Sequence, residues 1–165
     1  MITKHCLYKI LYKQNIKFFA GVPDSLLSHF SKELEYYNKE SIHIICPNEG
    51  NAVSAAIGYY AATTKIPAVY MQNSGLGNAI NPLISLAHKK VWAVPMVLII
   101  GWRGSYGIKD EPQHIQQGKI TKNFLNLLGI EFEVFKDLNN LNSITKLITK
   151  AKRNKLPVAI LFKKK

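Results

Sequence analysis

Apolar residues follow two alternating patterns along the whole chain. Short apolar runs, bounded by Gly, Pro or polar residues, are typical of strands in a parallel sheet. The runs lie at 17–21, 43–47, 66–72, 95–101, 131–135 and 157–162. Between them, apolar residues recur at intervals of three and four, or small residues dominate, as in helices that pack on a sheet. The predicted helical segments are 2–14, 26–34, 48–65, 73–88, 117–128 and 141–154.

This alternation predicts an α/β fold, with a six-stranded parallel sheet between two layers of helices and with right-handed crossovers. We expect residues 1–165 to form a single domain, because neither linkers nor repeats interrupt the pattern. A chain of 165 residues buries roughly two-thirds of its unfolded surface, so the core needs no disulfides. In open parallel sheets, ligands bind beyond the carboxyl ends of the strands.

Composition narrows the class of protein further. The two cysteines, Cys6 and Cys46, have no metal-ligand spacing, and we expect both to be free thiols in a reducing cytoplasm. The first residues lack the features of a secretory signal. The most apolar stretch, 91–100, is interrupted by Pro95 and is too short to span a bilayer. We therefore expect a cytoplasmic protein with no membrane partner.

The net charge of +12 raises the possibility of a polyanionic partner. Residues 136–165 carry nine basic residues against one acidic residue, so most of the excess lies at the C-terminal end. Aromatic residues do not alternate with these lysines, as they do in many nucleic-acid-binding surfaces. The pattern favours a solvated basic face, without a nucleic-acid partner.

Polar and glycine-rich residues are concentrated in four segments that follow predicted strands. These segments are 21–25, 47–51, 72–78 and 101–114. Glu49 follows a buried strand and begins a predicted helix. It is therefore either an acid in the ligand crevice or a carboxylate that stabilises the positive end of the helix.

Two of these segments contain further candidate chemistry. The glycines of 72–78 precede a helix and resemble an anion-cradling turn; the alternative is a simple tight turn with Ser74 as the helix N-cap. Arg103, one of only two arginines, is suited to bidentate recognition of a carboxylate or phosphonate; the alternative is a surface salt bridge. The other ionisable residues of segment 101–114 are Lys109, Asp110, Glu111 and His114.

Three strings carry a resemblance to a known family: FFAGVPDSLL, PNEGNAVSAAIGYYAATTKIPAVYMQNSGLGNAINPL and VPMVLIIGWRGSYGIKDEPQHIQQGKIT. In order and position, they resemble the pyrimidine-binding domain of phosphonopyruvate decarboxylase, a thiamine-diphosphate-dependent enzyme. The resemblance covers residues 15–162. Through MQNSGLGN, the chain is also similar to the alpha subunit of sulfopyruvate decarboxylase.

The resemblance implies a role for each segment that follows a strand. Glu49 would hydrogen-bond N1′ of the cofactor's aminopyrimidine and exchange a proton there, which prepares C2 of the thiazolium for attack on a 2-oxo acid. Asp24 would transfer a proton or orient the reacting groups. The residues that would line the pyrimidine and substrate side are Gln72, Asn73, Ser74 and Gly75. Those that would hold the anionic substrate are Arg103, Lys109 and His114.

The resemblance also implies a reaction and a partner. The reaction converts 3-phosphonopyruvate to phosphonoacetaldehyde and CO₂; the alternatives are decarboxylation of sulfopyruvate or another 2-oxo acid, and a non-catalytic basic binding module. Family members that act as one polypeptide bind the diphosphate and Mg²⁺ in a second domain, marked by a GDG…N stretch. This sequence contains no GDG. We therefore expect a diphosphate-binding beta-type subunit or domain to supply the Mg²⁺ ligands, within a homo- or hetero-oligomer.

Overall fold

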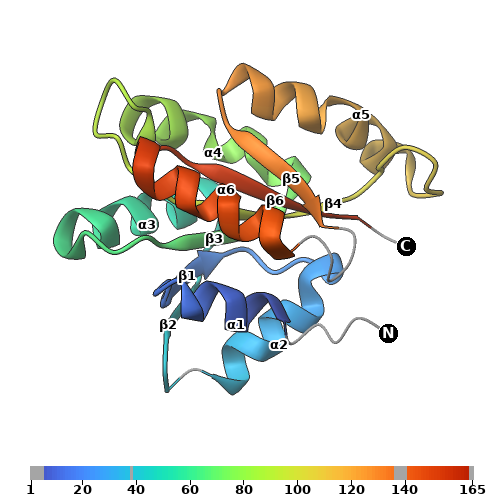
Figure 1. Ribbon diagram of the computed structural model, residues 1–165. Helices are drawn as coiled ribbons and strands as arrows, with labels where there is room; N and C mark the ends of the chain where they lie inside the picture. The colour runs from blue at the N-terminus through green and yellow to red at the C-terminus, as the bar shows by residue number, and fades with distance from the viewer. Residues whose placement is uncertain (1–5, 38, 136–140, 164–165) are drawn as a thin grey trace.

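A six-stranded, all-parallel sheet forms the centre of the molecule, with strand order β2-β1-β3-β4-β6-β5. The computed structural model describes residues 6–37, 39–135 and 141–163 (Figure 1). The strands are β1 (Phe18–Gly21), β2 (Ile42–Ile45), β3 (Ala68–Gln72), β4 (Val97–Trp102), β5 (Glu131–Phe135) and β6 (Val158–Lys163). The predicted α/β class and parallel sheet are confirmed.

Helices cover both faces of the sheet, as predicted. The helices are α1 (Cys6–Lys13), α2 (Ser28–Tyr36), α3 (Glu49–Thr63), α4 (Leu76–Pro82), α5 (Pro112–Leu127) and α6 (Leu141–Asn154). Residues of α3, α4 and α5 form one buried cluster with the sheet, and residues of α1, α2 and α6 form another on the opposite face. The αβα arrangement therefore has two cores that share the sheet.

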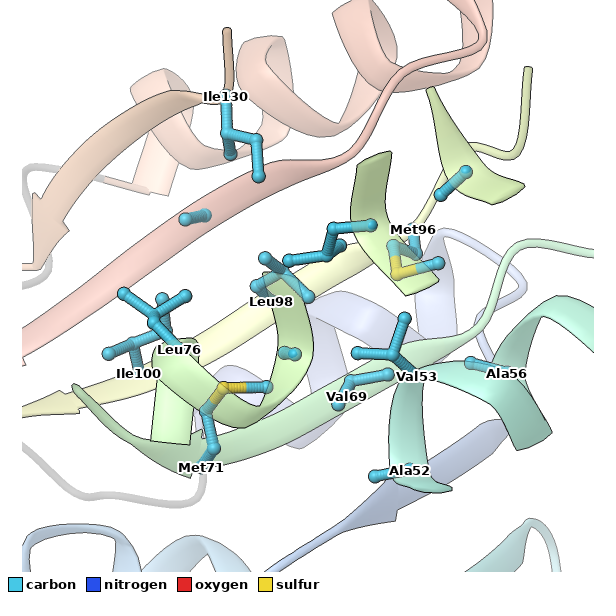
Figure 2. Close-up of a cluster of buried hydrophobic side chains, with 14 of the residues drawn as sticks. Ala52, Val53, Ala56, Val69, Met71, Leu76, Met96, Leu98, Ile100 and Ile130 are labelled. Carbon is cyan, nitrogen blue, oxygen red and sulfur yellow. The ribbon is translucent and has the colours of Figure 1, made fainter. Parts of the chain in front are cut away.

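Strand β4 contributes to both cores, because successive side chains of a strand point to opposite faces. Leu98 and Ile100 belong to one cluster, whereas Val97 and Ile99 belong to the other. Figure 2 shows part of the first cluster, in which Ile100 of β4 lies beside Leu76 of α4. The alanines of α3 allow this helix to lie close to the sheet, as the small-residue composition of 48–65 predicts.

Several element boundaries differ from the predicted ones. The helix predicted at 117–128 begins at Pro112, because proline suits the first helical position, where no N–H is needed. The segment 73–88 contains a 3₁₀ turn (Asn73–Gly75), α4 and a π-helical turn (Leu83–Ala87). Pro82 lacks the N–H that a regular α-helix would use, and the wider turn follows directly after it.

The N-terminal half differs from the prediction in smaller ways. A 3₁₀ turn, Ser25–Leu27, precedes α2. Strand β2 lies at the edge of the sheet and exposes much of its surface, with Ile45 62% exposed, whereas a run of isoleucines is typical of a buried strand. Cys46, just after β2, is a buried free thiol, as expected; the side chain of Cys6 lies outside the described residues. Among the described helices, none is long and apolar enough to cross a membrane.

Candidate active site

Four polar segments meet at the carboxyl edge of the sheet. Asp24 follows β1, Glu49 follows β2, residues 72–75 end β3 and begin the turn after it, and Arg103 follows β4. These strands are neighbours in the order β2-β1-β3-β4. The parallel topology therefore brings the predicted site segments to one edge, in the usual position for a ligand crevice.

Glu49 is the first residue of α3, with the side chain of Asn48 capping the helix by accepting a 2.9 Å hydrogen bond from Asn51 N. The Glu49 side chain is mostly buried, and its Oε2 accepts a 2.8 Å hydrogen bond from Asn78 Nδ2. Oε1 accepts no hydrogen bond from any described residue. A Cβ at Gly75 would overlap the Glu49 carboxyl group. One carboxylate oxygen is thus engaged and the other is available to a ligand.

The turn after β3 differs from the tight turn with a Ser74 N-cap that was one of the two interpretations of this segment. Ser74 lies inside the 3₁₀ turn and is not its N-cap, so that alternative is wrong. Gln72 Nε2 instead donates a 2.8 Å hydrogen bond to Ser74 Oγ. The backbone passes directly into α4 after Gly75. The turn therefore presents a glycine, not a cap side chain, toward Glu49.

Asn73 is buried and joins β3 to the loop after β4. Its Nδ2 donates to the Arg103 carbonyl oxygen at 3.1 Å and to Thr121 Oγ1 at 2.8 Å, while its Oδ1 accepts from Arg103 N at 3.1 Å. The resemblance placed Asn73 along the pyrimidine. In the structure its side chain instead fixes the backbone of the Arg103 loop. Thr121 was not singled out in the sequence, because its partner lies 48 positions away.

Asp110 organises the loop after β4. Its carboxylate accepts hydrogen bonds from Arg103 Nε and Nη2 at 3.0 and 2.9 Å, and lies 2.9 Å from His114 Nδ1. The backbone N–H groups of Gly104 and Glu111 also donate to it. The Arg103 guanidinium, followed by His114, holds the pKa of Asp110 well below its usual range. Asp110 has no predicted role of its own in the sequence.

Several N–H groups of the Arg103 guanidinium therefore already donate hydrogen bonds within the protein. Besides the bidentate pair with Asp110, Nη1 donates a 2.8 Å hydrogen bond to Ser25 Oγ. The alternative weighed for this residue was a surface salt bridge; an ion pair is present, but the side chain of its Asp110 partner is buried. A guanidinium has five N–H donors, so two remain for an anion. Lys109 is exposed on the same loop, and His114 lies in the first turn of α5.

Asp24 is a buried acid that follows β1 and lies against Gly101 of β4. Its Oδ2 accepts a 2.9 Å hydrogen bond from Leu26 N, whereas its Oδ1 is buried without a hydrogen-bond partner among the described residues. A Cβ at Gly101 would lie 2.7 Å from Oδ1, so the glycine makes room for the carboxylate. Burial raises the pKa of Asp24, opposed by the Leu26 hydrogen bond and by the nearby Arg103. Such a carboxyl group is suited to proton transfer.

Comparison with known proteins places this geometry in a family. Residues 1–125 match the thiamine pyrophosphate enzyme, N-terminal TPP binding domain. The chain belongs to this family. The family is named after the cofactor thiamine pyrophosphate, also called thiamine diphosphate. The sheet edge that contains Glu49 is therefore the candidate site for this cofactor.

Two relatives are informative because they differ in organisation. The chain is 37% identical over 118 residues to a phosphonopyruvate decarboxylase of Streptomyces viridochromogenes, covering 72% of this chain and 29% of that protein. It is 32% identical over 165 residues to the sulfopyruvate decarboxylase subunit alpha of Methanococcus maripaludis, covering 98% of this chain and 95% of that subunit. The predicted resemblance to both is confirmed.

The fold also matches solved structures. Benzoylformate decarboxylase from Polynucleobacter necessarius aligns with 98% of this chain and 29% of its own, with a TM-score of 0.71 and 16% identity. At that identity the likeness concerns the fold alone. The chain therefore has the fold of less than a third of this larger protein.

The residues of the TPP binding domain fit the aminopyrimidine half of the cofactor. The open Oε1 of Glu49 can accept a hydrogen bond from a ring nitrogen, and the glycine turn beside it leaves no side chain at Gly75. A metal-bound diphosphate needs a group of oxygen ligands for Mg²⁺. Among the described residues, no group of three or more His, Cys, Asp or Glu side chains is placed to hold a metal.

Proposed function

We propose that this chain is the pyrimidine-binding half of a thiamine-diphosphate-dependent decarboxylase that converts 3-phosphonopyruvate to phosphonoacetaldehyde and CO₂. The observation that carries the proposal is the Glu49 carboxylate, with one oxygen engaged by Asn78 and one free, at the edge shared with Asp24 and Arg103. The bound cofactor would supply the electron sink that decarboxylation requires. The 37% identity to a phosphonopyruvate decarboxylase supports this substrate.

In this proposal Glu49 Oε1 accepts a hydrogen bond from N1′ of the aminopyrimidine and exchanges a proton with it. Gln72, Ser74 and Gly75 line the ring, and Asn73 acts by holding the Arg103 loop in place. Asp24 is the second catalytic group. Its buried Oδ1 and its raised pKa suit it to holding or delivering a proton at the reacting carbon.

The substrate's anionic group is received by N–H donors of the loop after β4 and of the first turn of α5. The two uncommitted N–H groups of Arg103, the exposed Lys109 and the imidazole of His114 form this set. A sulfonate presents three oxygens much as a phosphonate does. Sulfopyruvate is therefore the second candidate substrate, favoured by the match along 95% of a sulfopyruvate decarboxylase alpha subunit.

We also propose that residues 1–165 form a pyrimidine-binding domain that works in a cytoplasmic oligomer with a diphosphate-binding beta-type subunit or domain. That partner would provide the Mg²⁺ ligands. The subunit naming of the alpha-type relatives supports a separate partner, and the free Cys46 thiol is in keeping with a reducing compartment.

Reconstitution tests the proposal. The purified chain with thiamine diphosphate and Mg²⁺ should not release CO₂ from phosphonopyruvate or sulfopyruvate, because no group of three or more His, Cys, Asp or Glu side chains among the described residues is placed to hold the metal. Addition of a diphosphate-binding subunit from the same organism should produce turnover, and the relative kcat/KM of the two substrates identifies the preferred one. The partner alone is the control. Turnover by the chain alone contradicts the split site, and no turnover with the partner favours the non-catalytic basic module.

Arg103→Lys tests the anion site within the reconstituted enzyme. We expect KM for the substrate to rise about 10- to 100-fold, because losing a charge-assisted hydrogen bond in a desolvated site costs about 1.5–3 kcal/mol and lysine cannot form the bidentate pair. The matched control is Arg153→Lys, which changes the only other arginine, exposed on α6. An unchanged KM would assign Arg103 to holding the loop through Asp110.

A further inference from the structure

The carboxylate of Glu49 contacts two residues of the segment that follows β3. A Cβ at Gly75 would overlap Cγ, Cδ and Oε1 of Glu49. Asn78 Nδ2 donates a 2.8 Å hydrogen bond to Oε2. Glu49 and Asn78 lie 29 positions apart in sequence. The two contacts restrict both the position of the carboxyl group and its rotation.

The helices that carry Glu49 and Asn78 are themselves in close contact. A Cβ at Gly50, the residue after Glu49, would lie 2.8 Å from the Asn78 carbonyl oxygen, so the first turns of α3 and α4 meet without an intervening side chain. The short Asn78 side chain can reach Glu49 only because the backbones approach this closely. The hydrogen bond is thus part of a defined helix contact, not an incidental surface pair.

We infer that Asn78 is a positioning residue that selects which oxygen of Glu49 faces the cofactor's aminopyrimidine. The inference rests on the proposed function and deepens it. With Oε2 bound to the Asn78 amide, Oε1 remains the oxygen that can exchange a proton with the ring. Gly75 has the complementary role, since any larger residue there displaces the same carboxyl group.

The chemistry of asparagine suits this role. A neutral amide donates a hydrogen bond without adding a charge. A lysine at this position would add a positive charge and form an ion pair, which favours the charged carboxylate more strongly. An aspartate would repel it. The amide therefore orients the carboxylate without pairing it with a charge.

The variants that test the inference each have a matched control in α4. Asn78→Ala removes the hydrogen bond, and its control is Asn81→Ala, which removes an exposed amide that accepts only from Ser85. Gly75→Ala places a methyl group against Glu49, and its control is Gly77→Ala, whose Cβ would meet no atom within 4 Å. Asn78→Ala and the two controls should fold, since all three residues lie at exposed positions.

The first measurement needs neither cofactor nor partner. Crystal structures of the variant chains should show the Glu49 carboxyl group displaced by on the order of 1 Å in Gly75→Ala, the shift that restores van der Waals contact. They should also show it rotated or disordered in Asn78→Ala. Both controls should retain the position found here. An unmoved carboxyl group in Asn78→Ala overturns the inference.

The second measurement is exchange of the C2 proton of cofactor bound to the reconstituted enzyme. Asn78→Ala should slow it about 10- to 100-fold, as expected for loss of a hydrogen bond to a charged group, with the substrate KM unchanged. In a Glu49→Gln background, Asn78→Ala should slow it no further, because the residue acts through Glu49. If Asn78→Ala slowed C2 proton exchange equally in the wild-type and in the Glu49→Gln backgrounds, Asn78 would have only a structural role and the inference would be overturned. Wild-type exchange in Glu49→Gln alone would instead refute the proposed function.

Discussion

Glu49→Gln should lower kcat of the reconstituted enzyme at least about 100-fold while leaving the fold and partner assembly intact. General acid–base groups typically contribute about 10²–10⁴-fold. Glutamine is nearly isosteric and can still contact N1′, but its amide cannot exchange a proton as the carboxylate does. The loss should therefore appear in kcat and in C2 proton exchange, with only a small change in cofactor affinity.

If Glu49 had only a structural role, we would expect a different result. Its only contribution would then be the charge at the first turn of α3, worth about 0.3–1 kcal/mol of stability, and turnover would be unchanged. The Tm of the isolated chain separates the two cases. We expect a decrease of at most a few degrees, together with the large loss in kcat. Wild-type C2 exchange in Glu49→Gln is the result that would refute the role proposed for this residue.

Gly21→Ala should destabilise the fold severely, even though it adds a single methyl group. Gly21 ends β1 and pairs with Tyr70 of β3. A Cβ at Gly21 would overlap the Tyr70 carbonyl oxygen and the edge of its ring. The ring is completely buried, and its hydroxyl lies 2.8 Å from His43 Nε2 on β2, two strands away. Glycine is what allows the tyrosine to lie across β1.

The expected cost of this substitution is about 3 kcal/mol or more. Overpacking typically costs about 1–3 kcal/mol, and displacement of the Tyr70 ring leaves a cavity and a buried hydroxyl without its partner. Burial raises the pKa of Tyr70 to about 12, so the phenol stays protonated near neutral pH. Urea denaturation monitored by circular dichroism measures the loss.

The matched control for Gly21→Ala is Gly58→Ala. Gly58 is exposed within α3, and its Cβ would meet no atom within 4 Å. The substitution should stabilise the chain by about 0.5–1 kcal/mol, because alanine is the better helix former. Equal midpoints for Gly21→Ala and the unmodified chain would show that the sheet moves to accept the methyl group.

The elements that sequence analysis located well are those with a local cause. The small residues of α3 and the unbroken apolar run of β4 indicate close packing and two-sided burial, and both are found. The start of α5 was placed too late because its first turn, with His114, is polar and has no apolar periodicity; Pro112 was the available signal. Strand β2 was predicted to be buried because a short apolar run does not distinguish an edge strand of a sheet from a central one.

The sequence alone determined the alternation of strands and helices, hence the parallel sheet and the edge at which Asp24, Glu49 and Arg103 gather, since the carboxyl ends of parallel strands lie at one edge. Only the tertiary structure decided the partners of these residues. Asn78 reaches Glu49 across 29 positions, and Asp110 takes up the guanidinium edge of Arg103. Such contacts depend on distances of a few ångströms between separate elements, which hydrophobic periodicity does not encode.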